Sequence, residues 1–224
     1  MKFQEWFPFY LQITDSLGIN RRDDYISSLA LHKIINNNDS IMKPYHGRNA
    51  FIIGNGPHLK DALTTISGGY VIVADSAIDT YIDYCGVPNI IVSDMDGNMD
   101  TILYSSKKGA IPVLHAHGDN MDKILTYAKY FQDAVATTQN IPMIHLYNFG
   151  GFTDGDRSAF LADHLGANHI TLIGFDFNNV NNKSYYNSSS VLKKRIKLAW
   201  ARYLLTYLAK SRGHKFSEGS IIEI

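Results

Sequence analysis

An apolar run leads directly into two carboxylates and a glycine in Ile90-Ile91-Val92-Ser93-Asp94-Met95-Asp96-Gly97. A continuous run of β-branched residues is typical of a strand that is covered on both faces. Similar runs occur at residues 50–53, 70–74, 89–92, 111–114, 133–136, 143–146 and 169–173. Segments of helical character, such as 121–131 and 157–165, lie between most of them. This alternation predicts an α/β fold with a mostly parallel central sheet and flanking helices.

The two ends of the chain have helical patterns. Apolar residues from Trp6 to Leu17 recur near helical spacing, Gly18 is a plausible stop, and Asp23 or Asp24 can cap a second helix. The cluster at 36–39 is typical of a loop. We therefore predict a helical N-terminal appendage over 1–45 and an α/β catalytic domain over 46–224. Near the C-terminus we expect a polar loop at 178–190, able to close as a lid, and a long helix over 190–211.

Composition limits the function before any motif is considered. The chain has 224 residues, 45% of them hydrophobic, and no net charge, which argues for a globular protein and against a general nucleic-acid binder. The single Cys85 excludes an internal disulfide and favours a reducing compartment. We expect no signal peptide, because the first residues lack an apolar stretch, and no apolar run is long enough to cross a bilayer. We expect a cytoplasmic protein without nucleic-acid or membrane partners, which could form a homo-oligomer.

The acidic residues have an unusual composition and placement. The chain has 18 Asp and only 3 Glu, residues 51–176 carry a net charge of −8, and residues 177–224 carry +7. Aspartates follow at least five of the predicted strands, and the carboxyl ends of parallel strands meet at one edge of a sheet, where ligands bind. The aspartates that follow strands are Asp75, Asp94, Asp96, Asp119, Asp154, Asp156 and Asp176. The alternative is that these residues cap helices.

Asp94 and Asp96 form the most informative pair. Beyond a strand end, both carboxylates can turn towards one cation, and Mg²⁺ prefers one or two carboxylates together with substrate phosphates. The segment Leu114-His115-Ala116-His117-Gly118-Asp119-Asn120 follows the same strand-to-helix pattern. We do not favour zinc there, because no third nitrogen or sulfur ligand has suitable spacing. His117 could carry a proton, contact phosphate or be structural, and Asp119 could bind metal or cap a helix.

Two glycine-containing turns could bind phosphate. Gly54-Asn55-Gly56-Pro57 joins the first run to a helix, so Asn55 and Gly56 could bring backbone close to phosphate, although a tight structural turn is a serious competitor. The turn from Phe149 to Arg157 contains three glycines and offers Arg157 for a bidentate phosphate contact. Lys193 and Lys194 open the basic C-terminal helix and could close over phosphates or face water.

These segments together resemble the archaeal 6-hydroxymethyl-7,8-dihydropterin diphosphokinases, relatives of thiamine pyrophosphokinase. The resemblance covers nearly the whole chain and is carried by motifs in the same order as in the family. Two departures are Ser76, where the family usually has glycine, and His58, where a small polar residue is expected. The motifs are Gly54–Pro57, Ala74–Ala77, Ser93–Gly97, His115–Asn120 and Gly151–Arg157.

The resemblance implies a fold like the thiamine pyrophosphokinase catalytic domain. It also implies Mg²⁺-dependent transfer of diphosphate from ATP to the pterin hydroxymethyl group, in tetrahydromethanopterin- or folate-type pterin biosynthesis. By matching motif, Asp94, Asp96 and Asp119 are the expected metal ligands, with Asp119 the first choice as proton acceptor. Asn55, Gly56, Asp75, Arg157, Lys193 and Lys194 are expected at ATP. Asp154, Phe152, His117 and Asn120 are expected at the pterin.

Three other functions remain open from the residues themselves. A phosphatase of the haloacid dehalogenase type also ends its nucleophile strand in Asp-x-Asp-Gly, but that strand usually opens the core, whereas two strands precede it here. A nucleotide-sugar transferase could use the same pair as a metal clamp. A nucleotide-binding or oligomerisation module would bind ATP without turning it over.

Overall fold

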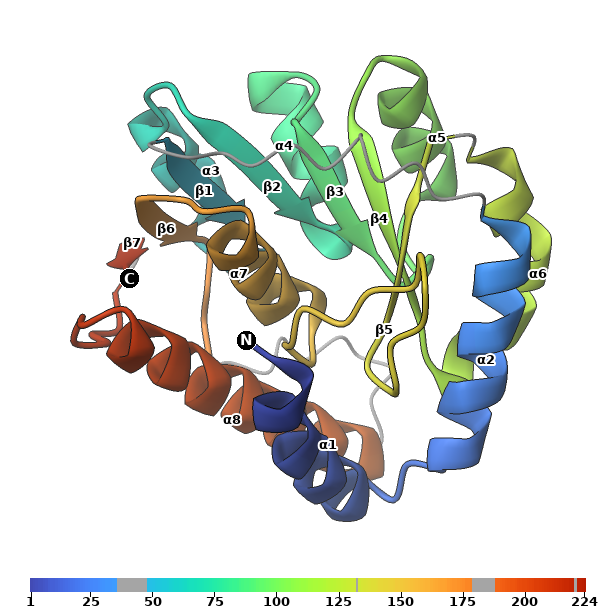
Figure 1. The fold of residues 1–224 in the computed structure, drawn as a ribbon. Helices are drawn as coiled ribbons and strands as arrows, with labels where there is room; N and C mark the ends of the chain where they lie inside the picture. Colours follow the sequence, from blue (N-terminus) through green and yellow to red (C-terminus); the bar gives the residue numbers. More distant parts are fainter. Residues whose placement is uncertain (36–47, 132, 179–187, 220) are drawn as a thin grey trace.

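The computed structural model describes residues 1–35, 48–131, 133–178, 188–219 and 221–224. Its centre is a seven-stranded sheet with the order β5-β4-β3-β2-β1-β6-β7 (Figure 1). Neighbouring strands pair in parallel from β5 to β6, and β7 pairs antiparallel with β6. The predicted α/β class with a mostly parallel sheet is therefore confirmed. The strands are β1 (Asn49–Ile53), β2 (Tyr70–Ala74), β3 (Ile90–Ser93), β4 (Ile111–Ala116), β5 (Val135–Thr138), β6 (His169–Ile173) and β7 (Ile221–Glu223).

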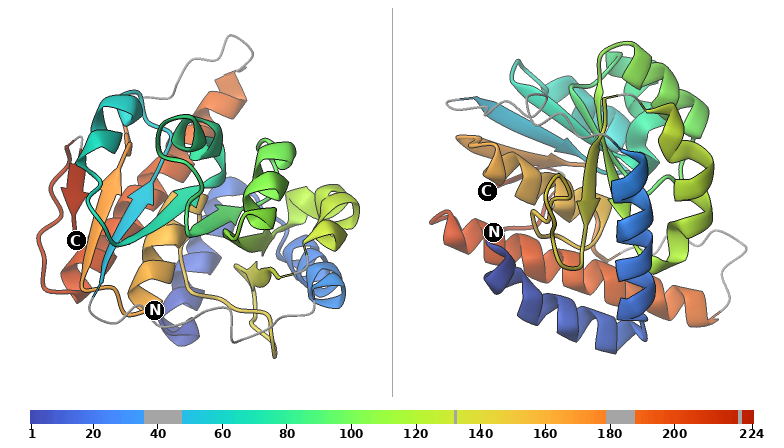
Figure 2. Two further views of the ribbon diagram at one scale, coloured as in Figure 1. Left: turned by 90° about the horizontal axis from the view of Figure 1, so that it is seen from above. Right: turned by 45° about the vertical axis from the view of Figure 1, so that its right-hand side comes forward.

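Helices cover both faces of this sheet, which is the middle of three layers (Figure 2). Successive residues of a strand point to opposite faces, so Ile52 packs in one core and Ile53 in the other. One face packs against α1 (Phe3–Leu17), α7 (Asp154–His164) and α8 (Ser188–Ser211). The other packs against α2 (Arg21–Ile34), α3 (Leu59–Ala62), α4 (Ile78–Cys85), α5 (Met99–Lys107) and α6 (Met121–Tyr127). Short 3₁₀ turns are η2 (Leu63–Thr65), η3 (Asp75–Ala77), η4 (Gly118–Asn120) and η5 (Ala128–Tyr130).

The strand order places a reversal beside β1. The chain adds β2 to β5 outward on one side of β1 and then returns to add β6 on the other side. Loops that leave the carboxyl ends of β1 and β6 therefore diverge, and such a switch point is where open α/β sheets bind ligands. The acidic strand ends of β2 and β3 lie next to it along the same edge.

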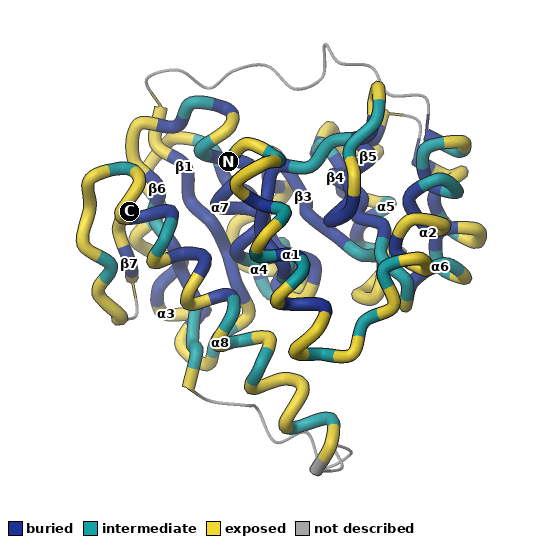
Figure 3. The backbone as a smooth tube through the Cα atoms, turned by 60° about the horizontal axis from the view of Figure 1, so that its bottom comes forward, coloured by how far each residue is buried: buried dark blue, intermediate teal, exposed yellow. Residues whose placement is uncertain are grey.

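The N-terminal helices pack closely on this sheet. Trp6 and Ile13 of α1 are fully buried in the same core as α7 and α8, and Figure 3 shows buried turns along α1. Helix α1 ends at Gly18 as predicted. The expected cap of the second helix at Asp23 or Asp24 is wrong, because Asn20 caps α2 by accepting a hydrogen bond from the Arg22 backbone. The division into an appendage and a domain stays a prediction.

One predicted strand is wrong. Residues 143–146 form a tight turn, in which Met143 and Leu146 exchange backbone hydrogen bonds and His145 has a φ of 60°. Leu146 is buried and Met143 packs against the same core, whereas Ile144 is 80% exposed, so the side chains of this short apolar run do not all face the core. Periodicity cannot separate such a turn from a short strand.

Other boundaries differ by small amounts. The β5 strand begins at Val135, two residues later than predicted, and the short edge strand β7 was not predicted. The predicted loop at 36–39 and most of the predicted lid lie outside the described residues. No helix in the described ranges is long and apolar enough to cross a membrane. The likeness to the thiamine pyrophosphokinase catalytic domain stays a prediction.

Candidate functional site

Three aspartates converge at the carboxyl ends of β2 and β3, and we call Asp75, Asp94 and Asp96 the acidic cluster. Ala74 of β2 pairs with Val92 of β3, so the residues that follow these two strand ends are neighbours. Each aspartate places a carboxylate oxygen within 4.8 Å of the other two. Asp75 is buried and Asp96 is exposed, so the cluster opens from a buried base to solvent.

The cluster fits a divalent cation. Opposite ligands of an octahedral Mg²⁺ lie about 4 Å apart, so small side-chain rotations would bring these oxygens into range. Asp75 Oδ1 and Asp94 Oδ1 are buried and have no hydrogen-bond partner among the described residues. Buried charged oxygens without a partner are costly, and a bound cation would satisfy both.

Asp75 forms the base of the cluster through close contacts with the neighbouring loop. Its Oδ2 accepts a short hydrogen bond from Ser93 Oγ, and its Oδ1 lies so close to Gly97 that a Cβ there would be 1.6 Å away. Burial raises the pKa of Asp75 to about 6, and the charges of Asp94 and Asp96 add to this rise against the Ser93 hydrogen bond. The absence of a side chain at Gly97 thus allows the Asp75 carboxylate to approach the loop closely.

The loop that carries the Asp-x-Asp pair is fixed by its middle residue. Met95 has a φ of 65° and is 1% exposed, and its backbone N–H donates to Ser93 Oγ at 2.8 Å. A left-handed conformation is unfavourable for a methionine, and burial of its side chain holds it there. Backbone of this kind often occurs at functional sites.

His117 orients Asp94. Its Nδ1 accepts from the Asp119 backbone N–H at 3.2 Å, so Nε2 carries the proton and donates to Asp94 Oδ2 at 3.1 Å. Burial alone would raise the pKa of Asp94, but the hydrogen bond from His117 and, more weakly, the charge of Arg157 hold it well below the usual range. Burial and the Asp94 charge raise the pKa of Asp96. One carboxylate of the pair is thus kept ionised next to a more basic one.

The turn that carries His117 is itself held from two directions. Asn120 is buried, accepts from the His117 backbone, and donates to the carbonyl oxygens of Asp94 and His115. Asp24 of α2, which is fully buried, accepts from the Gly118 backbone at 2.7 Å. The N-terminal helices therefore reach the site through one buried carboxylate.

The first turn of α7 lies over the same edge. Thr153 and Asp156 form a capping box, and Asp156 is buried and accepts from the backbone of Phe152 and Thr153. Arg157 is 4% exposed and donates to Asp154 Oδ1 at 2.8 Å. Burial, followed by the charge of Asp94, raises the pKa of Asp154 well above its usual range, despite Arg157. Asp154 and Arg157 thus interact electrostatically with the acidic cluster.

The glycine turn after β1 is explained by packing. Gly56 N–H donates to the Gly174 carbonyl at 2.7 Å, and a Cβ at Gly56 would lie 2.6 Å from that oxygen. The turn therefore closes the gap between β1 and β6 by direct backbone contact. Asn55 is exposed beside it. This arrangement is compatible with both predictions for the turn, a tight structural turn and a backbone contact to phosphate.

The structure separates the predicted residues into groups. Asp94 and Asp96 meet in the acidic cluster together with Asp75, whereas Asp119 is exposed and outside it. Phe152 is 8% exposed and belongs to the core. Lys193 and Lys194 are exposed on α8, and Lys197, which was not predicted, has its Nζ 6.0 Å from the centre of the Phe152 ring.

Sequence reasoning missed three further residues that shape the site. Ser93 could have been identified because it directly precedes the Asp-x-Asp pair. Lys197 had a weaker signal, namely its position one turn after Lys193 on a basic helix. Nothing in the sequence near Asp24 connects it to a loop that lies 94 positions away.

A mostly parallel sheet with an acidic cluster at its carboxyl edge, beside a buried arginine, is an arrangement typical of α/β enzymes that act on phosphorylated substrates. The family model described as 6-hydroxymethylpterin diphosphokinase MptE-like matches residues 28–182, and the chain belongs to this family. The resemblance found from the motifs is therefore confirmed.

Three relatives carry the name 6-hydroxymethyl-7,8-dihydropterin pyrophosphokinase. The protein from Pyrococcus furiosus is 37% identical over 99% of this chain and 100% of its own length. The one from Methanothermobacter thermautotrophicus is 37% identical over 94% of this chain and 97% of its own. The one from Methanocaldococcus jannaschii is 35% identical over 79% of this chain and 80% of its own.

Proposed function

We propose that this chain transfers diphosphate from ATP to the hydroxymethyl group of 6-hydroxymethyl-7,8-dihydropterin, with Mg²⁺, and releases AMP. The names of the relatives support the pterin and the transferred group. The observation that carries the proposal is the acidic cluster with its two unpartnered buried oxygens. We place the reaction in tetrahydromethanopterin- or folate-type pterin biosynthesis.

In the proposed reaction the hydroxymethyl oxygen attacks the β-phosphorus of ATP. The bond from that phosphorus to the α,β-bridging oxygen breaks, AMP leaves with the electron pair, and the hydroxyl proton passes to a base. When bound at the acidic cluster, Mg²⁺ would neutralise charge on the transferred phosphates. The chain supplies positioning and further charge stabilisation.

Different residues would hold the cation and accept the proton. Asp75, Asp94 and Asp96 would hold the cation, and His117 keeps Asp94 ionised and oriented. Asp119 stays our predicted proton acceptor, because its exposed side chain is on the turn that also carries His117, which contacts Asp94. Its predicted role as a third metal ligand also stays a prediction.

The substrate contacts are proposed on both sides of the cluster. Asn55, Gly56, Asp75, Arg157, Lys193 and Lys194 stay the predicted contacts of ATP, Asp75 now through the cation that it would hold. Lys197 joins them because its side chain reaches Phe152, just before the first turn of α7, which carries Arg157. Asp154, Phe152, His117 and Asn120 stay the predicted contacts of the pterin. Buried Phe152 and Asn120 would act as parts of the wall of the site, because neither side chain is exposed.

The test is AMP formation that depends on both the pterin and Mg²⁺, followed by chromatography. Asp94→Asn should lower kcat on the order of 100-fold, because it removes a charge next to the transferred group. Asp100→Asn, an exposed aspartate on α5, is the matched control and should behave as wild type. Full pterin-dependent activity in Asp94→Asn would contradict the proposal. Pterin-independent phosphate release would indicate a phosphatase, hydrolysis of sugar nucleotides a transferase, and ATP binding without turnover a binding module.

A further inference from the structure

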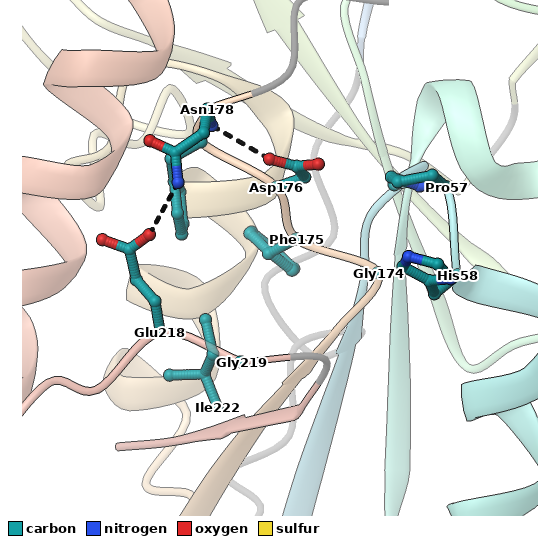
Figure 4. Close-up of a pocket in the computed structure, with 11 residues that line it drawn as sticks. Pro57, His58, Gly174, Phe175, Asp176, Asn178, Glu218, Gly219 and Ile222 are labelled. Atoms are coloured by element: carbon teal, nitrogen blue, oxygen red, sulfur yellow. Dashed lines mark hydrogen bonds between the residues drawn. The ribbon is translucent and has the colours of Figure 1, made fainter.

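A cavity of about 340 Å³ lies at the carboxyl ends of β1 and β6 (Figure 4). We call it the switch-point pocket, and it is lined by residues 56–58, 174–178, 218–219 and Ile222. Pro57 and His58 form one side, and Phe175, Asp176, Asn178 and Glu218 face them from the β6 side. None of the residues assigned above to the acidic cluster lines this pocket.

We propose that the switch-point pocket holds the adenosine part of ATP. The inference rests on the proposed function for the identity of the nucleotide, but its position follows from the fold. Pockets at the reversal of strand order in open α/β sheets are the usual place for a nucleotide. The volume is also in the range of small-molecule sites.

The chemistry of the lining fits an uncharged nucleoside. Among the described lining residues there is no lysine or arginine, and there are two carboxylates, Asp176 and Glu218, so a triphosphate would be repelled here. A carboxylate beside a nucleoside can accept hydrogen bonds from the ribose hydroxyls. Phe175 and Phe177, with ring centroids 6.1 Å apart, provide an apolar surface for the base.

The polar side of the pocket is organised by hydrogen bonds. Asn178 donates from its backbone to Asp176 at 2.9 Å and from its side chain to Glu218 at 3.1 Å. Arg202 of α8 pairs with the other oxygen of Glu218. An asparagine amide offers both a donor and an acceptor, which matches the edge of adenine.

The pocket is placed so that the phosphates would reach the acidic cluster. β1 lies beside β2, and Asp75 follows β2 directly, so the two sites are neighbours along the sheet edge. Phe175 also packs against the first turn of α7, since a Cβ at Gly155 would lie 2.9 Å from its ring. Adenosine at β1 and β6 leaves the side of the cluster near His117 and Asp154 for the pterin.

The pterin is also a flat heterocycle, so the test must separate the two substrates. His58 is exposed and lines the pocket, and His58→Trp puts an indole into it without disturbing the core. We expect the KM for ATP to rise about tenfold while the KM for the pterin stays within about twofold. His169→Trp is the control, since His169 is exposed at the opposite, amino end of β6. A rise in the pterin KM alone, or no change in either, overturns the assignment.

Equilibrium dialysis with labelled adenosine, without ATP, pterin or metal, gives a second readout that needs no turnover. Wild type and His169→Trp should bind adenosine saturably, and His58→Trp about tenfold more weakly. If His58→Trp does not fold, Asn178→Ala serves as the test variant. It removes an exposed amide of the pocket and should also weaken adenosine binding. Equal binding by all folded variants overturns the inference. Adenosine binding in a protein that makes no pterin diphosphate would leave the pocket assignment standing and reject the proposed function.

Discussion

The two carboxylate oxygens of Asp94 have different surroundings. Its Oδ2 is held by His117, whereas its Oδ1 is buried with no partner among the described residues. The hydrogen bond that His117 accepts from the Asp119 backbone fixes the ring, so the orientation of Asp94 depends on a backbone turn one strand away. Groups that orient a metal ligand in this way usually change metal affinity 10- to 100-fold when they are lost.

His117→Ala should therefore raise the Mg²⁺ concentration for half-maximal activity about tenfold, with smaller change at saturating Mg²⁺. His117→Gln, which can still donate to Asp94, should restore most of the affinity. A titration of activity with Mg²⁺ measures both, and His214→Ala, an exposed histidine after α8, is the control. An unchanged Mg²⁺ titration in His117→Ala would show that Asp94 needs no such support.

Asp75 should make the metal-free protein less stable at neutral pH. Burial raises its pKa from 3.8 to about 6, so the folded state holds this proton more tightly than the unfolded state does. The free energy of unfolding then falls as pH rises from about 4 to about 6, by at most about 3 kcal/mol. Asp75→Asn removes this part of the pH dependence.

Urea denaturation with EDTA at pH 4 and at pH 7 tests this prediction. Relative to wild type, Asp75→Asn should gain stability at pH 7 compared with pH 4. An equal difference at the two pH values would mean that the carboxyl of Asp75 titrates normally in the folded protein.

At the scale of elements, α2 acts as a support for the turn that carries His117. The carboxylate of Asp24 accepts from Tyr10 of α1, from Gln139 after β5 and from the Gly118 backbone. One fully buried side chain thus joins two helices to two loops of the sheet edge. Such a network is stabilising when every member is paired, and costly when one is removed.

Asp24→Asn should lower the free energy of unfolding by about 2–4 kcal/mol, because an amide NH₂ would face donors in place of an acceptor. The neighbouring Asp23 is exposed, so Asp23→Asn is the matched control and should change stability by less than about 0.5 kcal/mol. Urea denaturation measures both variants. Equal stability of the two would show that the Asp24 network contributes little.

Elements whose evidence lies within a short window could be predicted from the sequence. β2 and β6 have the predicted bounds, and α1 ends at the predicted glycine, because a buried parallel strand and a helix stop have local signatures. The turn at 143–146 could not, since its apolar composition is also that of a short strand, and the strand β7 could not, since it depends on pairing with β6. The same holds in the site: Asp94 and Asp96 share a motif, whereas the third member of the cluster, Asp75, joins them only through pairing of β2 with β3.

For the molecule as a whole, the packing of the N-terminal helices tests the predicted division at residue 45. Trp6, Tyr10 and Ile13 are at most 1% exposed and share a core with α7, α8 and the sheet. Each such side chain contributes about 2–3 kcal/mol, and a typical domain is stable by only about 5–15 kcal/mol. Deletion of residues 1–45 should therefore abolish cooperative thermal unfolding, as followed by circular dichroism. A cooperative transition in the shortened chain would support a separable appendage.

The charge asymmetry of the sequence also acquires a spatial meaning. The acidic central region supplies the acidic cluster, and the basic C-terminal region contains α8, which brings Lys197 to Phe152 just before the first turn of α7. A cytoplasmic location and a homo-oligomer stay predictions. Neither is needed for the arrangement of the described site.

The contact between Asp75 and Gly97 links the variation of two positions. A methyl group at position 97 would overlap the Asp75 carboxylate, since a Cβ there would lie 1.6 Å from its Oδ1. An alanine at 97 could thus be accommodated only if the Asp75 carboxylate turned away or position 75 became shorter, and either change would alter the acidic cluster. Chains descended from a common ancestor should therefore keep these two residues together. A relative that keeps aspartate at 75 but lacks glycine at 97 should hold that carboxylate in another orientation.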